Sequence, residues 1–150
     1  MLVIQVPLLA HTPMPHALTR FLDAQAAAYP AALAELRAGR KRTHWMWFVF
    51  PQVEGLGRSP TARLFAIAGL DEARAYLAHP VLGQRLLECV EAILALPGDD
   101  AHAVFGSPDD VKLCSSLTLF SAAAPDEPRF RAALAKYFAG QDDPLTLARL

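Results

Sequence analysis

The stretch VLGQRLLECVEAILALPG, residues 81–98, decides the fold class of this sequence. Its apolar side chains recur every three or four residues, the spacing that places them on one face of an α-helix. The dipeptide Pro97-Gly98 ends the pattern, because proline and glycine both disfavour a continuing helix. We therefore predict a helix over residues 81–96. The face that we expect to be buried carries Leu82, Leu86, Val90, Ile93 and Leu94.

Helix boundaries can be recognised on both sides of this segment. Three dipeptides join a good N-cap residue to a proline, which suits the first position of a helix. Each follows, within a few residues, a glycine that can end the preceding element. The dipeptides are Ser59-Pro60, Ser107-Pro108 and Asp143-Pro144, and the glycines are Gly57, Gly106 and Gly140.

Helical spacing also covers most of the remaining chain, and alternating strand patterns are missing outside one aromatic block. A stripe begins at Leu18, and Pro30 is expected to kink or restart that helix. The other expected helices include residues 107–122, 126–139 and 144–150. We predict one compact all-α domain over residues 18–150, with about seven or eight short helices. Residues 1–17 are expected to form an irregular, poorly ordered N-terminal extension.

Composition favours a cytoplasmic protein without a strong preference for polyanions. The 150 residues suit one domain, and the formal net charge of −1 gives no overall field that attracts nucleic acid or anionic membrane. The two cysteines, Cys89 and Cys114, form no disulfide framework, so a reducing compartment is expected. The apolar opening, residues 1–10, lacks the basic residue of a signal peptide and is too short to span a bilayer. Met14 offers an alternative start of translation.

The aromatic block HWMWFVFPQ, residues 44–52, is apolar on both faces if it is extended. A lone buried strand would leave its backbone groups without partners, so a short helix is the preferred interpretation. Arg40, Lys41 and Arg42 precede the block, and cations beside aromatic rings also occur in single-stranded nucleic-acid sites. We favour a structural role for these cations, with Gly39 ending a helix whose C-terminal dipole they complement.

The segment KLCSSLTLF, residues 112–120, combines polar and apolar faces. On a helix Lys112, Ser115 and Ser116 share one arc, where a cation and two hydroxyls can bind a phosphate or carboxylate. The alternative is structural: the serines bond to preceding carbonyls or allow close helix packing, and Lys112 pairs with Asp109.

Other chemistries find weaker support. Cys114 would need a base nearby and a lowered pKa to act as a nucleophile, and no spacing links it to His44 or His102. The five histidines show no metal-ligand spacing, so we predict no metal. Gly55 and Gly57 lie outside the strand–turn–helix context of a dinucleotide fingerprint, so we predict no cofactor.

Several motifs occur together in one known family. The segments HWMWFVFPQ, GLGRS, AYLAHPVLGQRL and VFGSPDDVKLCSSLTLF resemble the bacterial domain-of-unknown-function 1810 family, whose members are sometimes labelled calpastatin. The resemblance runs from about Leu18 to Leu150. It implies a small, mainly helical, cytoplasmic protein, and it implies no activity and no catalytic residues. Cys114 stands where the family is expected to carry a polar or basic side chain.

We hypothesise that these segments meet in space. The aromatic block 44–52 and the helix 107–122 would then form a cleft with aromatic walls and a few polar groups, the usual composition of a small-molecule site. The expected ligand is a small anionic metabolite, nucleotide-like or phosphorylated; whether it reacts is left open. The alternative is a non-enzymatic structural or protein-interaction domain. The residues expected to bind the ligand are His44, Trp47, Gln52, Lys112, Ser115 and Ser116.

Overall fold

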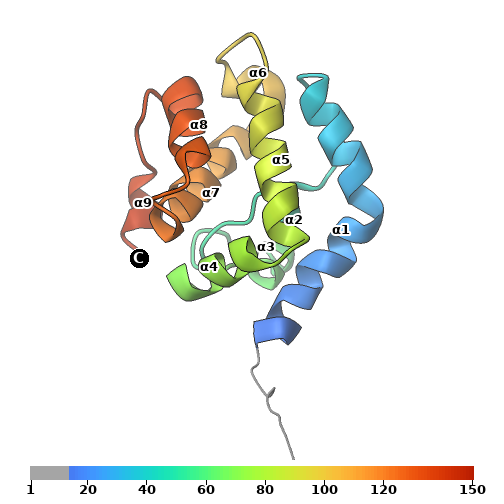
Figure 1. Ribbon diagram of the computed structural model, residues 1–150, viewed down its shortest axis with the longest axis vertical. Coiled ribbons are helices and arrows are strands. Elements are labelled where there is room, and N and C mark those ends of the chain that lie inside the picture. Colours follow the sequence, from blue (N-terminus) through green and yellow to red (C-terminus); the bar gives the residue numbers. More distant parts are fainter. Residues whose placement is uncertain (1–13) are drawn as a thin grey trace, which may run out of the picture.

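The computed structural model describes residues 14–150, which form an all-α domain (Figure 1). The described residues contain no strand; one isolated parallel bridge pairs Val53 with Ile67. The all-α prediction is confirmed, and the nine helices of this range exceed the expected seven or eight. They are α1 (Met14–Arg37), α2 (Met46–Val49), α3 (Pro60–Leu64), α4 (Leu70–Ala78), α5 (Leu82–Leu94), α6 (Ala101–Phe105), α7 (Asp109–Ala123), α8 (Pro128–Phe138) and α9 (Pro144–Leu147).

The N-terminal part of the chain agrees only partly with the sequence prediction. Residues 14–17, assigned to an irregular extension, form the first turn of α1, and residues 1–13 lie outside the described range. Pro30 does not restart the helix, because α1 continues through it to Arg37. Figure 1 shows a bend along α1, as expected where a proline removes one backbone hydrogen bond.

Two of the three predicted N-caps are confirmed. Ser59 Oγ accepts a hydrogen bond from the backbone N–H of Ala62. The Asp143 side chain accepts one from the N–H of Thr146. The prediction at Ser107 is wrong: α7 begins at Asp109 and Pro108 occupies the N-cap position.

The short helix α6 was not predicted, although its start carries a recognisable signal. Asp100 Oδ1 accepts a hydrogen bond of 3.1 Å from the N–H of Ala103, a regular N-cap contact. Gly106 follows with a φ of 72°, a left-handed conformation that glycine adopts at low cost. The five residues between them are too few to show a helical period in the sequence.

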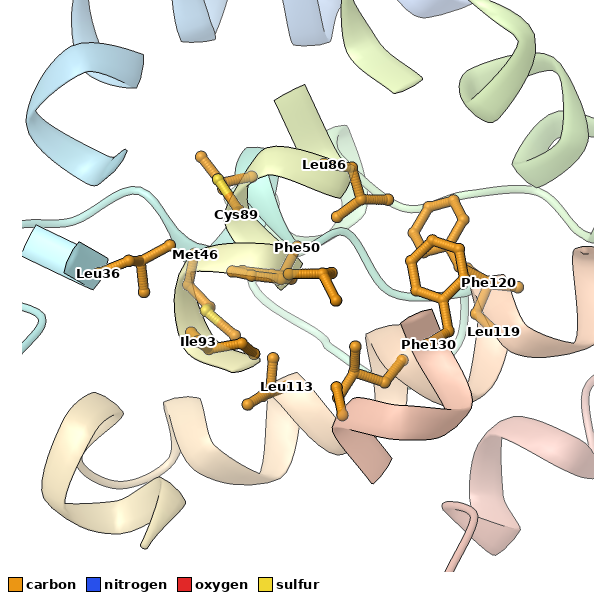
Figure 2. Packing of buried hydrophobic residues seen from close by; sticks show 14 of the residues in the cluster. Leu36, Met46, Phe50, Leu86, Cys89, Ile93, Leu113, Leu119, Phe120 and Phe130 are labelled. Atoms are coloured by element: carbon orange, nitrogen blue, oxygen red, sulfur yellow. The ribbon is translucent and has the colours of Figure 1, made fainter. Parts of the chain in front are cut away.

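Helix α5 lies at the centre of the domain, between α1 on one side and α7, α8 and α9 on the other (Figure 1). Leu82, Leu86, Val90 and Ile93 are buried as predicted, and Leu94 is only half-buried. Figure 2 shows side chains of α5 packed with Met46, Phe50 and residues of α7 and α8. None of the described helices is long and apolar enough to cross a membrane.

The aromatic block contains the helix α2, as preferred, and mostly belongs to this core. Trp45, Met46, Val49 and Phe50 are buried, whereas Trp47 is half-buried at the edge. Buried backbone N–H and C=O groups need hydrogen-bond partners, and a short helix provides some of them within the segment itself.

Buried Gln25 of α1 fixes the position of α2. Its Nε2 donates a hydrogen bond of 2.6 Å to the carbonyl oxygen of Phe48 and one of 3.0 Å to the hydroxyl of Tyr76 in α4. Burial raises the pKa of Tyr76, so this hydroxyl stays protonated. One buried amide thereby connects three helices around the aromatic block, and it compensates for the desolvation of a backbone carbonyl.

Candidate functional site

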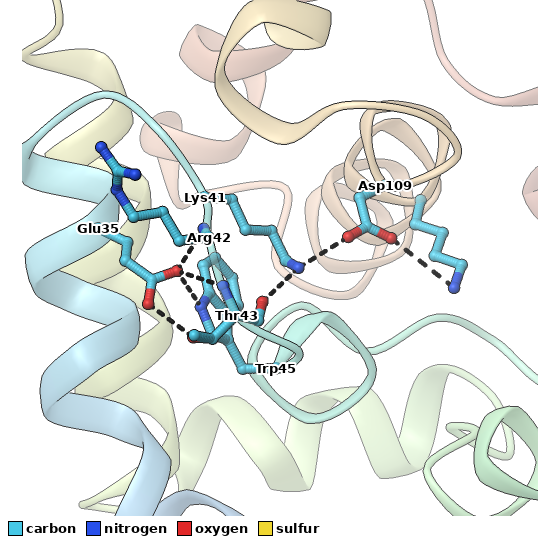
Figure 3. Close-up of polar contacts among 7 residues, drawn as sticks. Glu35, Lys41, Arg42, Thr43, Trp45 and Asp109 are labelled. Carbon is cyan, nitrogen blue, oxygen red and sulfur yellow. Dashed lines mark hydrogen bonds and ion pairs between the residues drawn. The ribbon is translucent and has the colours of Figure 1, made fainter.

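The loop that leads into the aromatic block is organised by Glu35 of α1 (Figure 3). Glu35 Oε1 accepts hydrogen bonds from the N–H of Arg42 at 2.7 Å, the N–H of Thr43 at 3.0 Å and the indole Nε1 of Trp45 at 2.9 Å. Oε2 accepts one from the Thr43 hydroxyl at 2.6 Å. Burial acts to raise the pKa of Glu35, but these donors outweigh it and lower the pKa to about 2. The carboxylate is therefore charged at neutral pH and orders the loop.

Lys41, in the middle of the basic run, connects the same loop to α7. Its Nζ lies 2.9 Å from Asp109 Oδ2 and 5.0 Å from the centroid of the Trp45 ring, and its side chain is only 8% exposed. Arg40 and Arg42 are exposed on either side. Gly39 has a φ of 80°, as expected for the glycine that ends a helix. Lys41 thus has a structural role, because its side chain is largely buried and paired with Asp109, as expected for this basic run.

Lys112 and Trp47 are brought together, as the sequence analysis predicts. Lys112 Nζ lies 4.7 Å from the centroid of the Trp47 ring, within the range of a cation–π contact. It also lies 3.8 Å from Asp109 Oδ1, at the limit of an ion pair, so the predicted pairing with Asp109 is present too. Asp109 therefore stands between two lysines, each of which lies over one tryptophan. The Lys112 side chain is 22% exposed and so retains access to solvent.

The two serines have different environments. Ser115 Oγ donates a hydrogen bond of 2.9 Å to Asp143 Oδ2, so it supports the start of α9. Ser116 is fully buried, and its Oγ makes no hydrogen bond within the described part of the chain. On α7, Ser116 lies one turn after Lys112 on the same helix face. Ser116 is therefore a buried residue on the helix face that carries Lys112.

The remaining predicted residues lie at the two ends of the aromatic block. His44 is exposed before α2. Gln52 is half-buried after it, and its backbone oxygen accepts a hydrogen bond of 2.8 Å from the N–H of Ile67. Four cavities of about 250–470 Å³ open elsewhere on the described surface, and none of them is lined by the six predicted residues. The cleft between the aromatic block and α7 stays a prediction; the contact observed between the two segments at these residues is that of Lys112 with Trp47.

Nucleophilic and metal chemistry remain without support. Burial raises the pKa of the Cys114 thiol, and the carboxylates of Asp143 and Asp142 raise it further, so the reactive thiolate is disfavoured. Burial also raises the pKa of Cys89, to about 12. Within residues 14–150 no group of three His, Cys, Asp or Glu side chains is arranged to hold a metal ion.

Comparison with known proteins places the fold in a family. The family model described as "Protein of unknown function (DUF1810)" matches residues 15–150. The chain belongs to the DUF1810 family. It is similar to the crystal structure of the conserved hypothetical protein Rv1873 from Mycobacterium tuberculosis, with a TM-score of 0.89 and 52% identity over 91% of this chain and 97% of that chain. No protein of curated function matches the sequence. The resemblance is confirmed, and these relatives assign no activity to a DUF1810 chain.

Sequence reasoning about this DUF1810 protein missed the role of Glu35 and the contact between Asp109 and Lys41. Glu35 looks like any acidic residue on a helix, because its partners Thr43 and Trp45 follow only after a loop of unknown path. Asp109 was recognised as a local partner of Lys112. Its stronger contact with Lys41 joins positions 68 residues apart (109 − 41), and no local pattern predicts such a contact.

Proposed function

We propose that this DUF1810 protein binds a small anionic metabolite, nucleotide-like or phosphorylated, where Lys112 meets Trp47. One observation carries the proposal: a partly exposed ammonium lies 4.7 Å from the ring centroid of a half-buried tryptophan. An indole face beside a cation suits a ligand that joins a flat ring to an acidic group. The ring stacks and the acid pairs with the ammonium.

The distances around Asp109 support this assignment of roles. Asp109 is 2.9 Å from Lys41 and 3.8 Å from Lys112, so its charge is directed mainly to the more buried lysine. Two ammonium groups share one carboxylate, which leaves a local charge of about +1 by simple addition. Exposed Arg42 adds a cation to the adjoining loop, where the Glu35 carboxylate adds one negative charge. Lys112 is thus the cation with the weaker internal partner, and an incoming phosphate or carboxylate can compete for it.

Buried Ser116 gives secondary support. Its Oγ has no hydrogen-bond partner in the described residues, and an unsatisfied buried hydroxyl typically costs about 1–3 kcal/mol. Such groups are retained more readily near functional sites than in ordinary cores. The proposal concerns binding and includes no reaction. It includes a cytoplasmic location, because both cysteines are free thiols, as is usual in reducing compartments.

A thermal-shift screen of the full chain tests the proposal, with nucleotides, dinucleotides and sugar phosphates as probes. A ligand at 100 times its Kd adds about 2.7 kcal/mol to stability, which raises Tm by several degrees. Lys112→Ala should abolish this shift and lower the ligand-free Tm by at most a few degrees, since its ion pair is partly exposed and weak and its cation–π contact is worth about 0.5–2 kcal/mol.

The matched control is Arg63→Ala, which removes one positive charge from an exposed position of α3. This variant should keep the full ligand-induced shift. A screen without shifts, or equal losses in both variants, would contradict the proposal. A large fall of the ligand-free Tm in Lys112→Ala would support the alternative function, in which the contacts of Lys112 only stabilise a structural or protein-interaction domain.

A further inference from the structure

A second surface lies on the opposite side of α7 and is not used by the proposed function. A cavity of about 280 Å³ opens between the first turns of α7 and the segment that joins α8 to α9. Its apolar wall is formed by Val111, Cys114, Phe138 and Pro144. We call this hollow the α7–α9 groove. Val111 and Cys114 lie on a different face of α7 from Lys112, so the groove and the Lys112–Trp47 contact face different directions.

Val111, which lines the α7–α9 groove, and Leu145, which follows the lining residue Pro144 in the chain, are the two most exposed large apolar side chains of the described residues. Val111 is 60% exposed, and Leu145, next to Pro144, is 67% exposed. A single exposed apolar residue is normal on a protein surface. Val111 stands at an apolar hollow, and together they form a surface that water solvates poorly and that a partner can cover with a gain in free energy.

The charge of the groove has one sign. Asp110, Asp142 and Asp143 line it, and the lining includes no lysine or arginine. Within residues 14–150 the Asp143 side chain accepts hydrogen bonds from the neutral donors of Ser115 and Thr146 and pairs with no cation. Asp142 pairs with Arg131 at 2.6 Å.

Two further observations concern the charge of the groove, one for Asp110 and one for Cys114. Asp110 Oδ2 lies 3.3 Å from Nδ1 of His102, whose side chain is 67% exposed. Besides burial, the carboxylates of Asp143 and Asp142 raise the pKa of Cys114, as a negative potential inside the groove requires.

We propose that the α7–α9 groove is a docking site for a segment of a partner protein in which an apolar side chain stands next to lysine or arginine. The groove is slightly smaller than the roughly 300–1,000 Å³ of small-molecule pockets, so it suits one or two side chains of a peptide. The apolar side chain enters between Val111 and Phe138. The cation then lies close to Asp143, which has no cationic partner in the described residues, and to Asp142, and these carboxylates supply the complementary charge.

Alkylation of Cys114 measures occupancy of the groove directly. Cys89 is fully buried, so in the folded chain N-ethylmaleimide at alkaline pH reports on Cys114. The probe is an acetylated and amidated Lys-Leu-Phe-Lys peptide at up to millimolar concentration, and the matched control is Glu-Leu-Phe-Glu. The lysine peptide should slow alkylation of Cys114 several-fold, and the glutamate peptide should not. Added salt should weaken the protection.

Surface variants test the two halves of the site without disturbing the core. Val111→Ser should remove most of the protection, whereas Leu64→Ser, which changes a residue 56% exposed on α3, should keep it. Asp142→Asn should weaken peptide binding about two- to five-fold, as for an exposed ion pair, and Asp71→Asn on α4 should leave it unchanged.

Three results would overturn the proposal. The first is that the lysine peptide gives no protection, and the second is that both peptides protect equally. The third is that alkylation slows as the protein alone is concentrated, because a second copy of the chain would then cover the groove. None of these results bears on the ligand-induced shift that depends on Lys112.

Discussion

The indole Nε1 of Trp45 donates a hydrogen bond of 2.9 Å to the carboxylate of Glu35. This contact links the largest buried ring of the aromatic block to α1. The same carboxylate accepts hydrogen bonds from the backbone N–H groups of Arg42 and Thr43. Glu35 therefore positions the Trp45 ring and also orders the loop before Trp45. Glu35 therefore holds the loop that follows Lys41, and Lys41 in turn contacts Asp109, the partner of Lys112. The position of these charged groups depends on one carboxylate.

The stability of the domain should accordingly depend on pH through Glu35. Burial opposes ionisation, yet the hydrogen bonds lower the pKa of Glu35 from its ordinary 4.5 to about 2. A lowered folded-state pKa means that the unfolded chain binds more protons in this range. The contribution of Glu35 is therefore complete above about pH 4.5 and is lost as the pH falls towards 2. Urea unfolding followed by tryptophan fluorescence between these pH values measures it.

The variant Glu35→Gln isolates this contribution. It should lower the free energy of unfolding at neutral pH by about 1.5–3 kcal/mol, the usual range for hydrogen bonds to a charged group. It should also flatten the decline of stability below pH 4.5 relative to the wild type. Glu54→Gln changes an exposed residue and is the control. A Glu35→Gln variant with the same acid decline as the wild type would show that other carboxylates cause it.

Adjacent serines of α7 should respond in opposite ways to the same substitution. Ser115→Ala removes the hydrogen bond of 2.9 Å to Asp143 and should cost about 1–2 kcal/mol of stability. Ser116→Ala removes a buried hydroxyl that makes no hydrogen bond in the described residues, so it should be neutral or stabilising by up to about 1 kcal/mol. Chemical denaturation of both variants checks the pair. Equal destabilisation would mean that Ser116 Oγ has a partner in solution.

Local patterns in the sequence predicted most of the helices, though not α6, and one contact of the site, the ion pair of Lys112 with Asp109. The period of residues 81–96 predicts the buried face of α5, and the Ser59 and Asp143 caps follow from short-range chemistry. Ser107 failed as a cap because Pro108 occupies that position, and spacing alone does not fix which residue begins a helix.

The contacts that complete the site could not be predicted in the same way. Lys112 was paired with Trp47 only by assuming that two characteristic segments meet. The links from Glu35 to Trp45 and from Lys41 to Asp109 depend on the path of the loop and on helix packing. Both are properties of the tertiary structure, which a helical period does not contain.

The two tryptophans of the aromatic block should differ in how strongly they support the fold. Trp45 is 1% exposed, and Trp45→Ala should cost about 3–5 kcal/mol, the range for removing a large buried ring together with the cavity that this creates. Trp47 is half-buried, so Trp47→Ala should cost clearly less: part of the ring already contacts water, and its cation–π contact with Lys112 is worth about 0.5–2 kcal/mol. Guanidinium unfolding of both variants provides the comparison. Equal costs would place Trp47 in the core and remove the aromatic wall on which the proposed ligand stacks.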